Sequence, residues 1–65
     1  MGSGFYPQLR ALLLQNGCRL VRQGKGSHEF WESPINGARF PVAVTVNTKN
    51  TVNAILKQAG IQRKV

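Results

Sequence analysis

Two apolar stripes with helical spacing, one near each end of the chain, constrain the fold more than any other feature of the sequence. The stripes consist of Leu9, Leu12 and Leu13 in the first and Val52, Ile55, Leu56 and Ala59 in the second. Each stripe is the apolar face of an amphipathic helix and has to be buried against another element. The first helix is expected over residues 7–15, because Pro7 suits a first helical turn and residues 16–17, Asn-Gly, can end it. The second begins after the polar segment 47–50, which offers several N-cap residues, and ends at Gly60.

The segment between these helices has the composition and the turn residues of β-strands. Strands are expected over residues 18–23, 27–32 and 39–46. Residues 24–26, Gly-Lys-Gly, form the turn of a hairpin, and residues 33–37 are rich in turn formers. Pro41 restricts the start of the third strand, since proline cannot donate to a central ladder. The order helix, three strands, helix predicts an α+β fold: a three-stranded antiparallel sheet with both helices on one face.

The length of 65 residues leaves room for a single domain, expected over residues 1–65, with a thin core. A large enzyme cleft is therefore not expected, and any chemistry comes from a few side chains on an exposed surface. Residues 1–4, Met-Gly-Ser-Gly, are assigned no function and are expected to be disordered or foreign to the domain.

The single cysteine, Cys18, lies in an apolar stretch and is expected to be a buried core thiol. Secreted domains of this size usually need disulfides, so a cytoplasmic location is expected. The sequence has no apolar run near the roughly 20 residues of a membrane span and no signal-peptide pattern, so no membrane partner is expected.

The charge of the chain is strongly positive, with nine Lys and Arg against Glu29 and Glu32 and a net charge of +7. The basic residues are distributed along the whole chain: Arg10, Arg19, Arg22, Lys25, Arg39, Lys49, Lys57, Arg63 and Lys64. This distribution indicates a folded body with a positive field rather than a detachable basic tail. Such a field favours polyanions, RNA among them, and acidic protein partners.

The densest candidate site is residues 24–31, Gly-Lys-Gly-Ser-His-Glu-Phe-Trp. Its glycines allow a ligand close to the backbone, and Lys25 adds a charge that attracts phosphate. His28 follows the turn, and an imidazole can carry a proton near neutral pH. RNA brings its own nucleophile, the 2′-OH, so no metal or other cofactor is expected; the sequence has no second His, no Asp and no cysteine pair. A Ser-His-acid hydrolase is disfavoured, because Ser27 and His28 are adjacent and point to opposite faces of a strand.

Simpler interpretations stay open at these positions. One histidine is ordinary for a chain of this length, and a Gly-Lys-Gly turn can be no more than a hairpin connection. Phe30 and Trp31 alternate across a strand, so one is expected in the core. The other is expected to be an exposed stacking platform or part of a partner interface.

Residues 26–28, Gly-Ser-His, followed by Phe30 and Trp31, resemble the signature of the HicA toxin family. The closing residues 51–61, Thr-Val-Asn-Ala-Ile-Leu-Lys-Gln-Ala-Gly-Ile, are similar to that family's C-terminal pattern, and the resemblance covers residues 6–61. It implies a fold similar to a double-stranded-RNA-binding domain. It also implies a type II toxin that cleaves mRNA, arrests translation and is neutralised by a HicB-type antitoxin. The catalytic histidine of the family follows the Gly-Ser pair, which carries over to His28.

One departure from the family limits the mechanism. Many relatives carry a further histidine after the third strand, but residues 40–47, Phe-Pro-Val-Ala-Val-Thr-Val-Asn, contain none. A two-histidine acid–base pair is therefore excluded for this chain. The oxygen that leaves in RNA cleavage has to be protonated by water, by Lys25 or another cation, or by no defined group.

The leading hypothesis is a metal-independent endoribonuclease in which His28 is the general base, or base and acid in turn. Lys25, Gly26 and Ser27 are expected to hold the scissile phosphate. The flanking phosphates are assigned, from charge and position alone, to Arg22, Arg39 and Lys49. The alternatives are a non-catalytic double-stranded-RNA-binding module and an interaction protein whose basic face docks an acidic partner. In the toxin interpretation the antitoxin is expected to cover His28 and to meet the basic face near Lys25 and Trp31.

Overall fold

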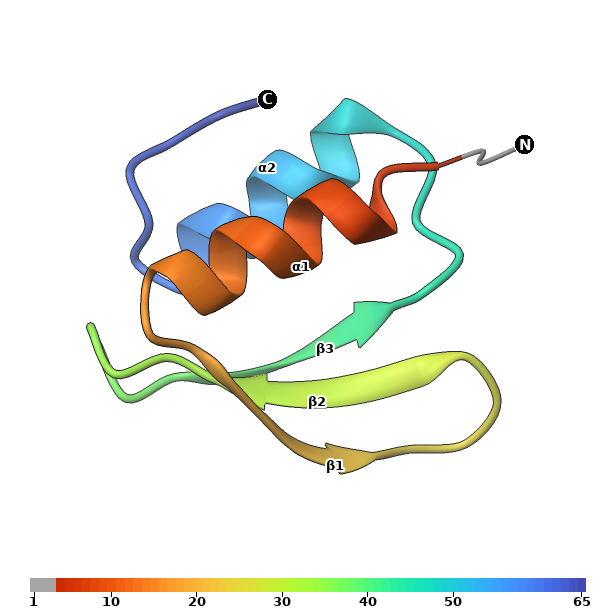
Figure 1. The fold of residues 1–65 in the computed structure, drawn as a ribbon, viewed down its shortest axis with the longest axis horizontal. Coiled ribbons are helices and arrows are strands. Elements are labelled where there is room, and N and C mark those ends of the chain that lie inside the picture. Colours follow the sequence, from red (N-terminus) through yellow and green to blue (C-terminus); the bar gives the residue numbers. More distant parts are fainter. Residues whose placement is uncertain (1–3) are drawn as a thin grey trace.

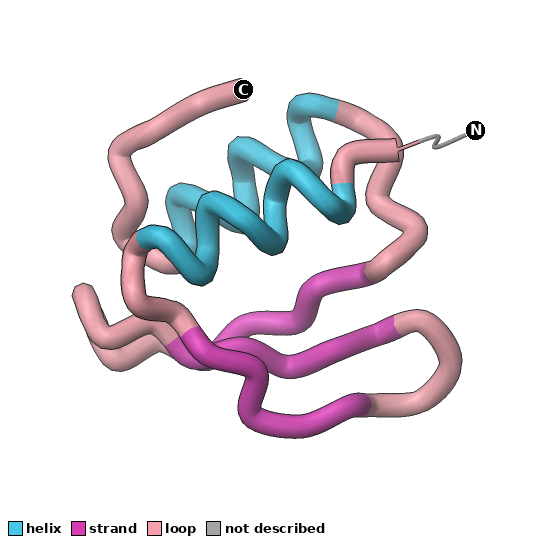
Figure 2. The backbone as a smooth tube through the Cα atoms, viewed as in Figure 1, coloured by secondary structure: helices cyan, strands magenta, loops and turns pink. Residues whose placement is uncertain are grey.

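A computed structural model describes residues 4–65, so residues 1–3 of the N-terminal tetrapeptide lie outside the described part. The elements in chain order are α1 (Tyr6–Gln15), β1 (Arg19–Gln23), β2 (His28–Glu32), β3 (Arg39–Ala43) and α2 (Lys49–Gln58). The three strands form one antiparallel sheet in the order β1-β2-β3. Both helices lie on the same side of this sheet, and within residues 4–65 its other side carries no helix (Figures 1 and 2). The predicted α+β architecture with the order α-β-β-β-α is therefore confirmed.

The core lies between the helices and one face of the sheet. The apolar stripes of both helices pack there against alternate residues of β2 and β3, in a cluster that includes Leu9, Leu13, Trp31, Phe40, Val42, Val52, Ile55 and Leu56. All five residues of β1 are exposed. This edge strand therefore adds backbone hydrogen bonds to the sheet but no side chain to the core. Cys18, just before β1, is buried as predicted.

The third strand is shorter than the expected span of 39–46, because the chain leaves the sheet at Ala43. The amide of Val44 still donates to the carbonyl of Ser27 at 2.8 Å, but that of Val46 folds back to the carbonyl of Ala43 at 3.1 Å. Val46 is buried, and its carbonyl accepts a hydrogen bond at 2.9 Å from the amide of Phe5, just before α1. These valines therefore lead the chain from the sheet up to the helix layer.

The ends of the helices follow the predicted signals closely. Thr48 caps α2, since its hydroxyl oxygen accepts a hydrogen bond from the amide of Thr51 at 3.3 Å. The turns after α1 and α2 contain Gly17 and Gly60, both with positive φ, a region open to glycine at little cost. The C-terminal end of α2 is tied to the β2–β3 connection by the fully buried Ser33, whose hydroxyl donates to the carbonyl of Ala59 at 2.6 Å.

Candidate functional site

The central strand β2 divides its side chains between the two faces of the sheet. Glu29 and Trp31 are buried beneath the helices, whereas His28, Phe30 and Glu32 point to the helix-free side. Residues paired across neighbouring strands share a face, so the strand register defines the rest of this surface. We call it the open face; it consists of Arg19, Arg22, His28, Phe30, Glu32, Arg39, Pro41 and Ala43.

His28 is the first residue of β2 and is exposed. Its backbone closes the β1–β2 hairpin: its carbonyl accepts from the amide of Gly24 at 2.9 Å, and its amide donates to the carbonyl of Lys25 at 3.3 Å. Within residues 4–65 the imidazole has no hydrogen bond or ion pair to another side chain. The hairpin thus fixes the backbone of His28 and leaves both ring nitrogens free for a ligand.

Lys25, Gly26 and Ser27 directly precede His28 in the connection between β1 and β2. Lys25 and Gly26 are exposed, and a side chain added at Gly26 would meet nothing within 4 Å. Gly24 serves a different purpose: a Cβ there would lie 2.9 Å from the ring of Phe30. The missing side chain of Gly24 therefore makes room for Phe30 rather than for a ligand.

The structure decides between the two aromatic residues of β2. Trp31 is only 1% exposed and belongs to the core, while Phe30 is half-buried on the open face. The guanidinium carbon of Arg22 lies 5.1 Å from the centroid of the Phe30 ring, which is a cation–π contact. The side chain of Trp31 is therefore not available for direct contact with a partner, and Phe30 is the aromatic residue of β2 at the surface.

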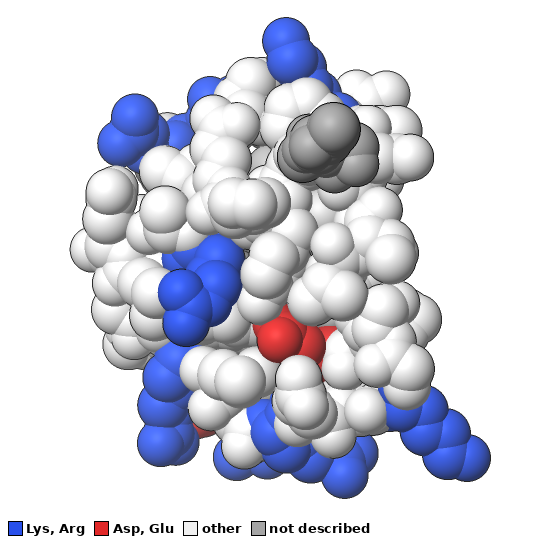
Figure 3. All heavy atoms as spheres, turned by 45° about the vertical axis from the view of Figure 1, so that its right-hand side comes forward, with Lys and Arg blue, Asp and Glu red and all other residues white. Residues whose placement is uncertain are grey.

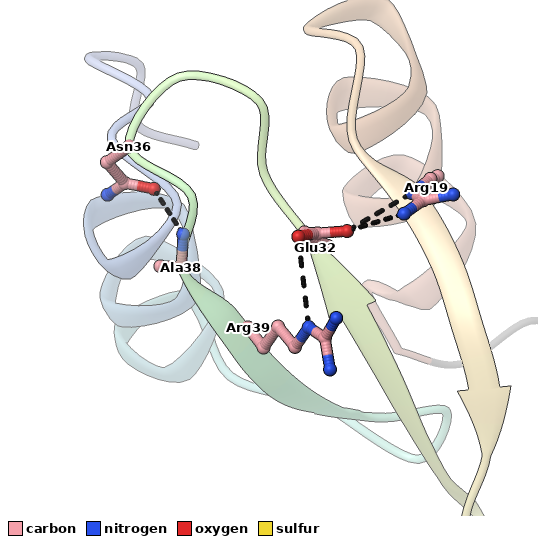
Figure 4. A network of polar contacts seen from close by, with 5 residues as sticks. All are labelled: Arg19, Glu32, Asn36, Ala38 and Arg39. Carbon is pink, nitrogen blue, oxygen red and sulfur yellow. Dashed lines mark hydrogen bonds and ion pairs between the residues drawn. The ribbon is translucent and has the colours of Figure 1, made fainter.

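The other end of the open face carries a three-residue ion-pair group (Figure 4). Nη2 of Arg19 lies 2.8 Å from Oε1 of Glu32, and Nε of Arg39 lies 3.8 Å from Oε2 of the same carboxylate. The hydrogen bonds from Arg19 and the positive charges of both arginines lower the pKa of Glu32. Arg39, predicted to contact RNA, therefore shares its charge with Glu32, whereas Arg22 has no acidic partner within residues 4–65.

Lys49 lies apart from the open face. It is the first residue of α2, in the helix layer, at the end of the molecule that also carries the β1–β2 turn (Figure 1). The structure therefore brings His28, Arg22 and Arg39 together on one surface, places residues 25–27 at its edge and leaves Lys49 in the other layer. Figure 3 shows Lys and Arg atoms along the lower rim, where the sheet lies, and again in the helix layer at the top.

The sequence interpretation assigned no role to Glu29 and did not predict its burial. Its carboxylate is 6% exposed, and Oε1 accepts hydrogen bonds from Oη of Tyr6 at 2.8 Å and from Nε1 of Trp31 at 3.0 Å. Burial by itself raises the pKa of Glu29, but the hydrogen bonds from Tyr6 and Trp31 outweigh it and hold the pKa below its usual value. The available signal was the strand alternation, which gives Glu29 the same face as Trp31.

Within residues 4–65 no group of three or more His, Cys, Asp and Glu lies close enough together to hold a metal ion. Neither helix in this part of the chain is long and apolar enough to cross a membrane.

Comparison with protein families gives a match over almost the whole fold. The model described as the HicA toxin of bacterial toxin–antitoxin systems matches residues 6–61, from the first residue of α1 to just beyond α2. The chain belongs to the HicA toxin family. Neither a curated protein nor a solved structure gives a match. As a HicA toxin, it is the toxin component of a toxin–antitoxin system, which implies an antitoxin partner.

Proposed function

We propose that this HicA toxin is an endoribonuclease that cleaves mRNA, with His28 as its general base. The observation that carries the proposal is the exposed imidazole, which has no competing partner within residues 4–65 and lies beside a cationic turn. The family resemblance supports the same residue, since His28 follows the Gly-Ser pair. Arrest of translation by loss of mRNA would explain why such a protein is a toxin.

The chemistry requires one proton carrier and positive charge near a phosphate. A ring nitrogen of His28 takes the proton of a ribose 2′-OH, and O2′ attacks the adjacent phosphorus as the bond from phosphorus to the 5′-oxygen breaks. The products are a 2′,3′-cyclic phosphate and a free 5′-OH, whose proton comes from water or from the imidazolium. Because the nucleophile belongs to the substrate, the reaction needs no metal ion.

The turn supplies the charge that this reaction needs. The ammonium group of Lys25 can approach a phosphate from the edge of the open face, and the exposed backbone at Gly26, beside the half-buried Ser27, allows the phosphate to come close. Arg22 and Arg39 extend the positive surface away from His28 along the sheet. Lys49 contacts RNA only if the bound RNA strand also passes the end of the helix layer.

The test is cleavage of a defined mRNA in the presence of a chelator by wild-type protein and the His28→Ala and His28→Gln variants. Removal of the general base is expected to slow cleavage by about 10²–10⁴-fold, and the wild-type products are expected to end in a 2′,3′-cyclic phosphate. Gln58→Ala, at an exposed position of α2, is the control variant and is expected to retain the rate. Undiminished cleavage by both His28 variants would contradict the assignment.

A second candidate function is a double-stranded-RNA-binding module without catalysis. The observation that favours it is the placement of Lys25 and Lys49 at the same end of an α-β-β-β-α fold. Such a module would bind duplex RNA with steep salt dependence and would not need His28. Growth arrest on expression that is relieved by His28→Ala, while antitoxin binding persists, distinguishes the nuclease from this module.

The antitoxin is proposed to be a HicB-type protein that covers His28. An acidic surface on this partner would complement the basic turn at Lys25, and an apolar or aromatic contact would be made with Phe30 rather than with the buried Trp31. A complex that leaves His28 open to an RNA strand would count against this proposal.

A further inference from the structure

The pair formed by Arg22 and Phe30 lies in the middle of the open face. Phe30 is paired with Arg22 of β1 on one side and with Pro41 of β3 on the other. Its ring packs against the bare backbone of Gly24, which fixes the ring in place. The guanidinium carbon of Arg22 lies over the ring, 5.1 Å from its centroid.

The charge of Arg22 differs from that of the other two arginines on this surface. Arg19 and Arg39 both contact the carboxylate of Glu32, whereas the only partner of Arg22 within residues 4–65 is the Phe30 ring. The pair therefore combines a planar cation with a half-buried aromatic ring, and no acidic group neutralises it. These are the two kinds of surface on which unpaired bases stack.

The position of the pair relative to His28 sets which part of an RNA it can contact. His28 and Phe30 are separated by one residue on β2 and point to the same side. The repeat of a strand places them about 7 Å apart, a distance that one nucleotide spans. With a phosphate at His28, the base of the adjoining nucleotide can reach the Arg22–Phe30 pair.

We infer that the open face binds single-stranded RNA, with the base of a nucleotide next to the cleaved bond stacked on the Arg22–Phe30 pair. This inference deepens the proposed function and takes its reference point, a phosphate at His28, from it. Stacking on a side chain needs an unpaired base, so the surface selects single strands over duplexes. Phe30 supports the guanidinium plane of Arg22 and the base stacks on that plane, which makes both residues binding and positioning groups.

The experiment measures binding rather than cleavage. Fluorescence anisotropy follows the wild-type protein and its variants with a labelled single-stranded oligoribonucleotide made uncleavable by 2′-O-methyl groups, and with a duplex of the same sequence. Phe30→Leu keeps an apolar side chain but removes the ring, and Arg22→Lys keeps the charge but removes the plane. Each is expected to weaken single-strand binding roughly five- to hundredfold, the effect of losing one stacked base, and to leave duplex binding unchanged.

Matched controls make the same chemical changes elsewhere. Phe5→Leu alters another half-buried phenylalanine, and Arg63→Lys alters an exposed arginine beyond α2; both are expected to bind single strands as the wild type does. Circular dichroism checks that each variant is folded. If Phe30→Leu fails to fold, Arg22→Lys still tests the inference, since its side chain is exposed.

Two results would overturn the inference: single-strand binding by Arg22→Lys equal to that of the wild type, or equal losses on single strands and duplexes. The second result would show that the open face binds duplexes as well as single strands. Because the oligonucleotide is uncleavable, absence of nuclease activity would refute the proposed function and leave the stacking surface standing. Cleavage that depends on His28 but is unchanged in the Arg22 and Phe30 variants would support the proposed function and contradict the stacking inference.

Discussion

At the scale of single residues, His28 and Glu29 are neighbours on β2 that point to opposite faces of the sheet and have different roles. His28 faces solvent with its ring free, and Glu29 faces the helices with its carboxylate bonded to Tyr6 and Trp31. A buried carboxylate is costly unless hydrogen bonds compensate for the lost water. Through Tyr6, which belongs to α1, Glu29 joins that helix to the strand that carries the histidine.

Replacement of this carboxylate is expected to change how stability depends on pH. The pKa of Glu29 is lowered in the folded protein, so its stabilising contribution is present above its unfolded pKa of about 4.3 and is lost as the pH falls through the folded pKa. Glu29→Gln is therefore expected to lower the free energy of unfolding at pH 7 by about 1–3 kcal/mol, and by less near pH 3. Urea denaturation at both pH values measures this.

The control for this change is Glu32→Gln, which removes the exposed carboxylate from the opposite face of the same strand. Its pKa is lowered as well, but its partners are surface arginines whose attraction water and salt screen, so a smaller effect on unfolding is expected. An equal loss of stability at both pH values for Glu29→Gln would show that the negative charge itself is not what stabilises the fold.

At the scale of elements, the segment between β3 and α2 determines where the second helix begins. The chain leaves the sheet at Ala43, buries Val46 and reaches Thr48, whose hydroxyl accepts from the amide of Thr51 and donates to its Oγ1 at 2.8 Å. The helix has no acidic residue in its first turn, so this cap is its main local stabilisation at that end.

Loss of the cap is expected to destabilise the protein without affecting the site. Thr48→Ala removes the acceptor for the amide of Thr51 and should lower the free energy of unfolding by about 1 kcal/mol. Thr48→Ser keeps the hydroxyl and should retain nearly all of that stability. Thermal or urea unfolding compares the three proteins, and equal stability of the Ala and Ser variants would show that the cap contributes nothing.

At the scale of the whole molecule, nine basic residues and two acids give a positive field that reaches both layers. Only two carboxylates oppose the nine cations, so the acids do little to weaken this field at a distance. Binding of a polyanion should therefore be dominated by counterion release and fall steeply with salt.

The contribution of the turn to this field can be measured separately from base stacking. If Lys25 contacts one phosphate of a single strand, Lys25→Gln should make the slope of log K against log salt less steep by about 0.7. Arg22→Lys keeps its charge and should leave that slope unchanged while weakening binding. Titrations of the uncleavable oligonucleotide over a range of NaCl concentrations give the slopes, with Arg63→Gln as the control away from the sheet. An unchanged slope for Lys25→Gln would remove Lys25 from the phosphate contacts.

The sequence by itself determined the features that depend on neighbours in the chain. Leucines and other apolar residues at helical spacing, Thr48 before α2 and the glycines after each helix act within a few residues, so element types and most boundaries could be predicted. His28 was singled out in the same way, by a turn and a strand start that are both local, and by the family resemblance.

Only the tertiary structure decided which residues share the surface of His28. Whether Phe30 or Trp31 entered the core depended on which face of the sheet the helices cover, and the pairing of Arg22 with Phe30 depended on the register shift between Leu20 and Arg22 in β1. The early end of β3 goes together with the packing of Val46 in the core, and Glu29 is buried because the helices cover its face of the sheet, where Tyr6 donates a hydrogen bond to it. Each of these is a contact between residues distant in sequence, and such contacts exist only once the sheet and the helices have packed together.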